Sequence, residues 1–383
     1  MNRILTYTSI IVGTVALLSC FDNCTGGFTA VNLSNGSSQS ASTSMGGPTS
    51  PGMNTSVPTI LGVSQTFTQG STVTIVGSGF GTRSSAKPVY FSDFDSYPLN
   101  DSALNTGLSA PMGTIPNEPY IDNTRAVSGA QSLRMDYPLN KNGEFPEVML
   151  QNLSLTQVYV SAWIYWERTA GSGAGGPPIF KLVRAEANPP YHGYPGFYET
   201  IFPNAAGQVI GTDRGSVASD RTVTYGDTIN AGQTSGVWHR IDYYYKLSTP
   251  GVADGVFESW VDGVLNANIQ NTMSRLSGST ATINDIISPF DGISNYGISN
   301  SYSLWVDNFY VDSTQARVEL GDAPTFAGCK TRYIQPSTAW DDGAVAITVN
   351  LNQFTSGEKV YLYIVSPDGN VNNNGYPVTV GGS

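Results

Sequence analysis

The sequence predicts an all-β protein. Short runs of alternating apolar and polar residues, bounded by Gly, Pro, Asn and Asp, recur along the chain, and no strong amphipathic helix pattern appears. The composition agrees, because the 383 residues include 42 glycines and 21 tyrosines but only 12% charged residues. We therefore expect short strands and many turns over most of the chain.

The first twenty residues have the pattern of an export signal. Arg3 supplies a positive charge, and residues 10–18 form an apolar segment. This segment is too short to span a bilayer as a helix, which takes about 20 apolar residues. It ends in Leu-Leu-Ser followed by Cys20, which resembles a bacterial lipobox. The resemblance implies that residues 1–19 are a lipoprotein signal peptide and that Cys20 carries a lipid anchor in the membrane.

The residue after the cysteine is Phe21 and not Asp, which by resemblance to enteric sorting favours the outer membrane or the cell surface. An ordinary signal peptide with an incidental cysteine is the alternative. Residues 20–56 are dominated by Ser, Thr, Gly and Asn and contain few large apolar side chains. Such a segment buries too little surface to fold, so we expect a flexible tether.

The charge and the cysteines limit the classes of function. The formal net charge of −11 and the pI of about 4.5 argue against nucleic acid as a partner, although a local basic groove would still accept an acidic polysaccharide. Two histidines argue against a His-rich catalytic metal site. Besides Cys20, the chain has Cys24 and Cys329, and whether these two pair stays open.

The two ends of the remaining chain look like halves of one domain. Val73 and Ile75 alternate with threonines, and Gly-Ser-Gly-Phe-Gly follows at 77–81. This opening resembles an IPT/TIG immunoglobulin-like domain, and residues 337–381 resemble the second half of the same family. We expect one split immunoglobulin-like sandwich from residues 57–87 and 323–383. Two separate small β modules are the alternative.

Residues 88–322 have longer and more aromatic strand patterns. The chain reads Trp-His-Arg-Ile from Trp238, Thr-Pro-Gly-Val-Ala-Asp-Gly up to Gly255, and Trp-Val-Asp-Gly from Trp260. This series resembles the concanavalin A-like jelly rolls, and is closest to those of alginate and glucuronate lyases. The resemblance implies a jelly-roll sandwich inserted in the smaller domain. It leaves the activity open, because the superfamily contains both binding modules and polysaccharide lyases.

Three strand patterns in this domain place aromatic and charged residues on the same face. Alternation with a period of two puts Phe257 toward the core and Trp260 away from it. Aromatic rings stack on sugars, and charged groups bond to hydroxyls, so this face is our candidate carbohydrate surface. Packing and solubility alone also produce such faces. The candidate residues are Trp163, Tyr165, Arg240, Tyr244, Lys246, Glu258 and Trp260.

A polysaccharide lyase is the alternative function. It needs a base and a group that neutralises the uronate carboxylate, and Lys181 or Arg184 fits the second role. However, the Gln-x-His and Glu-x-Asp-x-Glu motifs of other jelly-roll enzymes are missing from the sequence. We therefore favour glycan binding over catalysis, and a structural or adhesive surface protein without a sugar ligand is the third interpretation. The candidate bases are Tyr191, His192, Tyr194 and Tyr198.

Three acidic residues suggest an ion that links the ends of the jelly roll. Asp93 and Asp95 lie at its entry and Asp307 near its exit, which resembles a structural calcium position of the superfamily. Calcium takes six to eight oxygen ligands, so solvated turn residues are the alternative interpretation. We expect no other cofactor.

Overall fold

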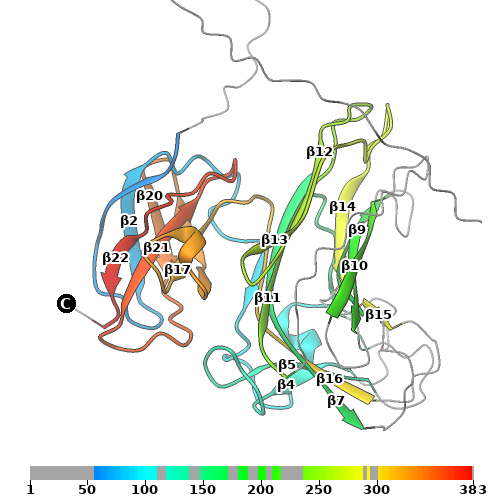
Figure 1. Cartoon of the computed structure of the whole chain (residues 1–383), viewed down its shortest axis with the longest axis horizontal. Helices are drawn as coiled ribbons and strands as arrows, with labels where there is room; N and C mark the ends of the chain where they lie inside the picture. The colour runs from blue at the N-terminus through cyan, green and yellow to red at the C-terminus, as the bar shows by residue number, and fades with distance from the viewer. Residues whose placement is uncertain are drawn as a thin grey trace, which may run out of the picture. The chain divides into compact units, whose positions relative to one another are not determined.

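The computed structural model describes residues 56–109, 118–137, 146, 148–170, 180–188, 197–203, 209–216, 236–287, 291–293 and 301–381. They belong to one compact unit, Met53–Ser383. The described part consists of strands and two short 3-10 helices, Ala103–Thr106 and Phe326–Gly328, which confirms the predicted all-β class (Figure 1). None of its helices has the length and apolarity to cross a membrane.

The larger domain is a sandwich of two antiparallel sheets. The eight-stranded sheet has the order β13-β12-β11-β7-β16-β5-β4, and β3 pairs with β16. Its strands are β3 (Tyr90–Ser92), β4 (Tyr120–Asp122), β5 (Ser132–Tyr137), β7 (Gln157–Ala170), β11 (His239–Lys246), β12 (Gly255–Val261), β13 (Val264–Thr272) and β16 (Ser301–Asp312).

The six-stranded sheet has the order β10-β9-β8-β14-β6, and β15 pairs with β8. Side chains of both sheets meet in one core, including Val160 and Phe257 from the first sheet and Ala185 and Ile286 from the second. This is the predicted jelly-roll sandwich. The strands of the second sheet are β6 (Met149–Leu150), β8 (Phe180–Asn188), β9 (Phe197–Pro203), β10 (Val209–Ser216), β14 (Thr282–Ile287) and β15 (Asp291–Ile293).

The smaller domain combines strands from before and after the jelly roll. Val73 is paired with Ile347 and Ile75 with Val345, all four fully buried. These strands, β2 (blue) and β20 (orange), lie side by side in Figure 1. The IPT/TIG identity and the domain boundaries stay predictions. One sheet consists of β1 (Thr59–Val63), β2 (Thr72–Ser78), β20 (Ala344–Thr348) and β19 (Ser337–Trp340), and the other of β18 (Arg332–Gln335), β17 (Arg317–Gly321), β21 (Lys359–Val365) and β22 (Tyr376–Thr379).

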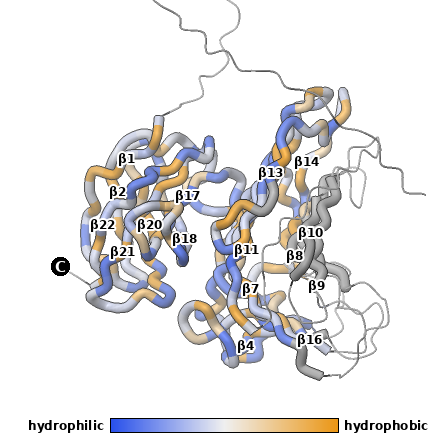
Figure 2. The backbone as a smooth tube through the Cα atoms, viewed as in Figure 1, coloured by the Kyte–Doolittle hydropathy of each residue, from blue (hydrophilic) through white to orange (hydrophobic). Residues whose placement is uncertain are grey.

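Alternation along the strands explains both cores. Apolar stretches are short and alternate with polar ones along the backbone (Figure 2). In β12, every second residue is buried, and Phe257 and Val261 belong to the jelly-roll core. Trp260 and Glu258 are half-buried on the other face. The predicted direction of the β12 side chains is therefore confirmed.

Candidate functional site

The predicted carbohydrate residues do share the outer face of the eight-stranded sheet. Arg240 on β11 is paired with Trp163 on β7, and Asp242 is paired with Trp260 on β12. Residues that are paired across strands lie on the same side of a sheet. The neighbouring positions Ile241 and Val261 are in the sandwich core, so this face points away from the core.

The smaller domain packs on this face. Trp163 is only 9% exposed, and its ring centroid lies 5.4 Å from that of Tyr333 in β18. Arg240 is 3% exposed and Tyr244 is buried as well, whereas Tyr165 is buried beneath Arg125 of the jelly roll itself. At these described positions, the face is part of a buried contact and not the open surface that we predicted. The physical reason is that alternation gives the direction of a side chain and says nothing about a second domain above it.

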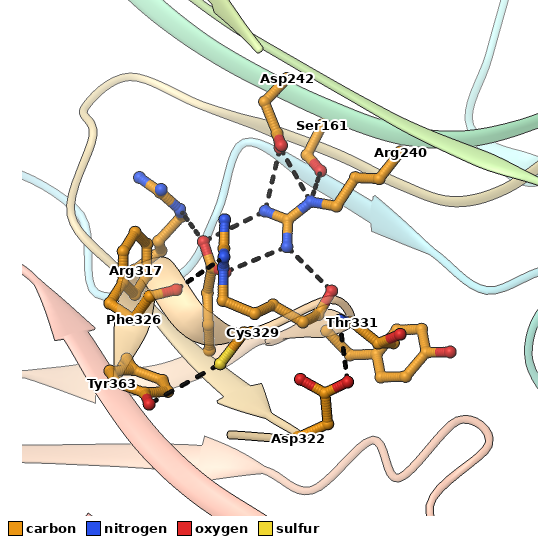
Figure 3. Close-up of polar contacts among 12 residues, drawn as sticks. Ser161, Arg240, Asp242, Arg317, Asp322, Phe326, Cys329, Thr331 and Tyr363 are labelled. Carbon is orange, nitrogen blue, oxygen red and sulfur yellow. Dashed lines mark hydrogen bonds and ion pairs between the residues drawn. The ribbon is translucent and has the colours of Figure 1, made fainter. Parts of the chain in front are cut away.

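An ion network around Glu319 forms the centre of this contact. Figure 3 shows its labelled members Arg240, Asp242 and Arg317. The Glu319 carboxylate, fully buried on β17, accepts two hydrogen bonds from the Arg240 guanidinium, with N–O distances of 3.0 and 3.1 Å. It also accepts one from Arg317 Nε at 2.6 Å and one from Arg332 Nε at 2.9 Å. The carboxylate of one sandwich thus binds a guanidinium of the other.

On the jelly-roll side of the network, Arg240 and Asp242 also have hydrogen-bond partners. Arg240 donates to Asp242 Oδ1 and to the backbone carbonyl of Arg332, and Asp242 accepts a 2.7 Å hydrogen bond from Tyr159. Burial alone would raise the pKa of Glu319, but the three guanidinium groups lower it well below its usual 4.5. Because buried charges are stable only when they are paired and hydrogen-bonded, Arg240 is primarily a structural residue.

Three predicted residues of β11 and β12 are less buried, and one of them, Trp260, packs against the cluster that contains Tyr244 and Ile334. Lys246 is exposed, and Glu258 and Trp260 are half-buried. Burial raises the pKa of Glu258, whose carboxylate accepts a 3.0 Å hydrogen bond from Gln270. A role of these residues in glycan binding stays a prediction.

Among the candidate lyase residues, Tyr191, His192 and Tyr194 lie outside the described residues. The register of the six-stranded sheet brings Tyr198 of β9 directly opposite Arg184 of β8. A base candidate and a carboxylate-neutralising candidate, 14 positions apart in the sequence, thus occupy neighbouring positions.

The pair belongs to a larger group of polar positions. Ala185 and Ile286, which are paired across β8 and β14, are in the sandwich core, so the adjacent position Arg184 is on the outer face. Lys181 is opposite Thr200, two residues beyond Tyr198 on the same strand. We call this group the polar sheet face, and it consists of the positions Lys181, Arg184, Glu186, Tyr198, Thr200, Asp213, Asp285 and Asp291.

Five residues of the polar sheet face were not predicted from the sequence: Glu186, Thr200, Asp213, Asp285 and Asp291. They come from five different strands, and only the register of the sheet places them near Lys181 and Arg184. Alternation within each strand gives a face but no neighbours across strands, so no sequence signal could have found them.

The predicted calcium residues hold a loop. Asp307 is fully buried, and its carboxylate accepts hydrogen bonds from the backbone N–H groups of Val127 and Ser128, at 2.8 and 2.9 Å. Burial raises its pKa to about 8, although these hydrogen bonds oppose the rise. Asp95 accepts two more from the N–H groups of Ala130 and Gln131.

Backbone donors thus occupy two of the three carboxylates that we expected to bind calcium. Between them lies Gly129, where an added Cβ would come within 1.5 Å of the Asp95 side chain. Asp93 is half-buried, and its pKa is raised by burial and by the charge of Asp95. No group of three or more His, Cys, Asp or Glu side chains in the described part is arranged to hold a metal ion, and calcium stays a prediction.

The cysteines are only partly described. Cys20 and Cys24 lie outside the described residues. Cys329 is buried as a free thiol, with its sulfur 3.7 Å from the Tyr363 hydroxyl oxygen. The Cys24–Cys329 pairing and the lipid on Cys20 therefore stay predictions.

Several solved structures are similar to this chain in fold. No family model matches the chain, and no curated protein matches it. The structure of the alginate lyase Aly36B is similar, with 15% sequence identity and a TM-score of 0.45 over 60% of this chain and 97% of that chain. The endo-β-1,4-glucuronan lyase from the fungus Trichoderma reesei has 17% identity and a TM-score of 0.40, over 59% of this chain and 96% of that chain. The cellulose induced protein Cip1 has 17% identity and a TM-score of 0.38, over 59% of this chain and 97% of that chain.

Proposed function

We propose that this chain binds a uronate-containing polysaccharide at the polar sheet face. The observation that carries the proposal is the register of β8 and β9, which sets Arg184 opposite Tyr198 and Lys181 opposite Thr200. The smaller domain covers much of the face of the other sheet that we first considered. The six-stranded sheet therefore offers the better candidate surface.

The residue types suit an acidic sugar polymer. The positions directly opposite Arg184 are Ile287 and Tyr198, and neither supplies a carboxylate. An arginine is a natural partner for the carboxylate of a uronate, since guanidinium and carboxylate groups match in charge and geometry. Thr200, Asp213 and Asp291 offer acceptors and donors for hydroxyl groups in the adjacent row.

A polysaccharide lyase is a second candidate, favoured by the same pair of positions. In a β-elimination, a base takes the C5 proton next to the uronate carboxylate, and a cation stabilises the charge that develops there. The C4–C5 double bond forms as the glycosidic C4–O bond breaks, and the leaving oxygen takes a proton from water. Tyr198 would be the base and Arg184 the cation. The two functions share a surface and differ only in whether the bound polymer is cut.

One experiment tests both functions. We expect Arg184→Gln to weaken the binding of a uronate oligosaccharide about tenfold or more, because a hydrogen bond to a charged group contributes about 1.5–3 kcal/mol. Tyr198→Phe should keep binding and, if the chain is a lyase, abolish the unsaturated product seen by its ultraviolet absorbance. Calorimetry and absorbance on the same samples give the two readouts. Unchanged binding in Arg184→Gln would contradict the proposal.

We also propose that the protein works outside the cytoplasm, held to the outer membrane or the cell surface by a lipid on Cys20. The Leu-Leu-Ser-Cys sequence after a short apolar segment supports this. In cells, Cys20→Ser should move the protein from the membrane fraction to the soluble fraction and end its labelling by a fatty acid. Ser19→Ala keeps a small residue before the cysteine and is the control. A labelled, membrane-bound Cys20→Ser protein would refute the anchor.

A further inference from the structure

A half-exposed arginine lies over two aromatic rings on the eight-stranded sheet. The guanidinium carbon of Arg125 is 4.3 Å from the ring centroid of Tyr165 and 5.2 Å from that of Trp305. The two rings are 7% and 2% exposed, whereas the Arg125 side chain is 35% exposed. Contact with two buried rings therefore holds in place a guanidinium that solvent still reaches.

The protein uses only part of this guanidinium. Arg125 Nη2 donates to Glu167 Oε2 at 2.7 Å, and within the described part of the chain Glu167 is the only side chain that accepts a hydrogen bond from it. Arg240 offers the contrast, because it donates to Asp242, Glu319 and a backbone carbonyl and its side chain is only 4% exposed. The N–H groups of Arg240 are used in hydrogen bonds within the protein, whereas Arg125 keeps N–H groups that can donate to a ligand.

The surroundings of Arg125 suit a sugar. Trp238 is half-buried, and its ring centroid lies 5.6 Å from that of Tyr165 at an interplanar angle of 57°. Glu167 is 32% exposed and accepts a 3.3 Å hydrogen bond from the Tyr165 hydroxyl, which leaves it able to accept from a ligand hydroxyl. An aromatic ring, a carboxylate and an arginine thus lie within one small area.

We propose that Arg125, Glu167 and Trp238, which lie around the buried ring of Tyr165 and which we call the Arg125 surface, bind a sugar that carries a carboxylate. Arg125 donates to the carboxylate of a uronic acid unit, the partly exposed ring of Trp238 packs against the sugar, and Glu167 accepts from a hydroxyl. The inference rests on the ligand class of the proposed function and adds a second contact area on the other sheet of the sandwich.

The test compares two tetrasaccharides that differ only in the carboxylate, β-1,4-linked glucuronate and β-1,4-linked glucose. With the full chain, we expect Arg125→Gln to weaken binding of the glucuronate tetramer about tenfold, the factor that 1.4 kcal/mol produces. It should leave any binding of the glucose tetramer unchanged, since that ligand has no charge to pair. Trp238→Ala should weaken both. Lys330→Gln, which removes a positive charge at an exposed position of the smaller domain, is the control and should change neither.

Arg184→Gln, measured in parallel, separates this inference from the proposed function. Weaker glucuronate binding in Arg125→Gln and in Arg184→Gln supports two contact areas. An effect only in Arg184→Gln overturns the Arg125 surface and supports the proposed function. An effect only in Arg125→Gln supports the Arg125 surface and overturns binding at the polar sheet face. Thermal unfolding of Arg125→Gln must match the wild type, and if it does not, Arg125→Lys, which keeps the charge but loses the planar fork, replaces it. A full-affinity Arg125→Lys would also overturn the inference.

Discussion

Replacing Glu319 by alanine should reduce the free energy of unfolding by about 3–5 kcal/mol, the usual cost of removing one partner of a buried ion pair. The fully buried carboxylate is shared by Arg240, Arg317 and Arg332, so its loss leaves three cations with too few partners. Chemical denaturation monitored by tryptophan fluorescence measures the loss. Glu118→Ala removes an exposed carboxylate and should change the free energy of unfolding by less than about 0.5 kcal/mol. Equal effects of the two substitutions would contradict the role of the network.

The pH dependence of the same difference gives an independent readout. The pKa of Glu319 is lowered in the folded protein, so its contribution is fully present above the unfolded pKa of about 4.5 and decreases as the pH falls below that value. The difference in stability between the wild type and Glu319→Gln should therefore be constant from pH 7 to about 5 and shrink in stronger acid. If the stability difference between the wild type and Glu319→Gln grew as the pH fell, it would contradict a lowered pKa of Glu319 in the folded protein.

Phe257→Ala should cost about 3–5 kcal/mol of stability, because it leaves a cavity in the jelly-roll core. Phe257 is 2% exposed, and its ring centroid lies 6.2 Å from that of Tyr243. Trp260→Ala, three residues further along β12, removes a larger ring that is only half-buried, and should cost less. Thermal unfolding of both variants gives the comparison. A larger loss in Trp260→Ala would invert our assignment of the two faces.

The Glu319 network also defines the relation of the two sandwiches. A buried, bidentate guanidinium–carboxylate pair between β11 and β17 is unlike the polar and solvated contact of freely moving domains. The Trp163 ring belongs to the core cluster of the smaller domain, although β7 is a jelly-roll strand. The smaller domain is therefore fixed on the jelly roll by both polar and apolar contacts.

The sequence by itself determined the class of fold and the direction of individual side chains. Alternation in β12 assigned Phe257 and Trp260 to opposite faces, because a strand has a period of two whatever lies around it. The early Val-Thr-Ile pattern similarly indicated a strand with one buried face, and Val73 and Ile75 are fully buried. These features depend on a few consecutive residues, which is why they can be predicted from the sequence.

Only the tertiary structure decided which face is covered and which residues meet. Arg240 and Glu319 are 79 positions apart, and nothing in either segment indicates that they form an ion pair. The same aromatic and charged pattern that suits a sugar also suits a contact between domains, so the local pattern could not distinguish them. Arg184 and Tyr198 become neighbours through the register of β8 and β9, and Arg125 lies over Tyr165 through the packing of a loop on a strand. Both candidate sites therefore depend on contacts between distant segments, which alternation within one strand cannot specify.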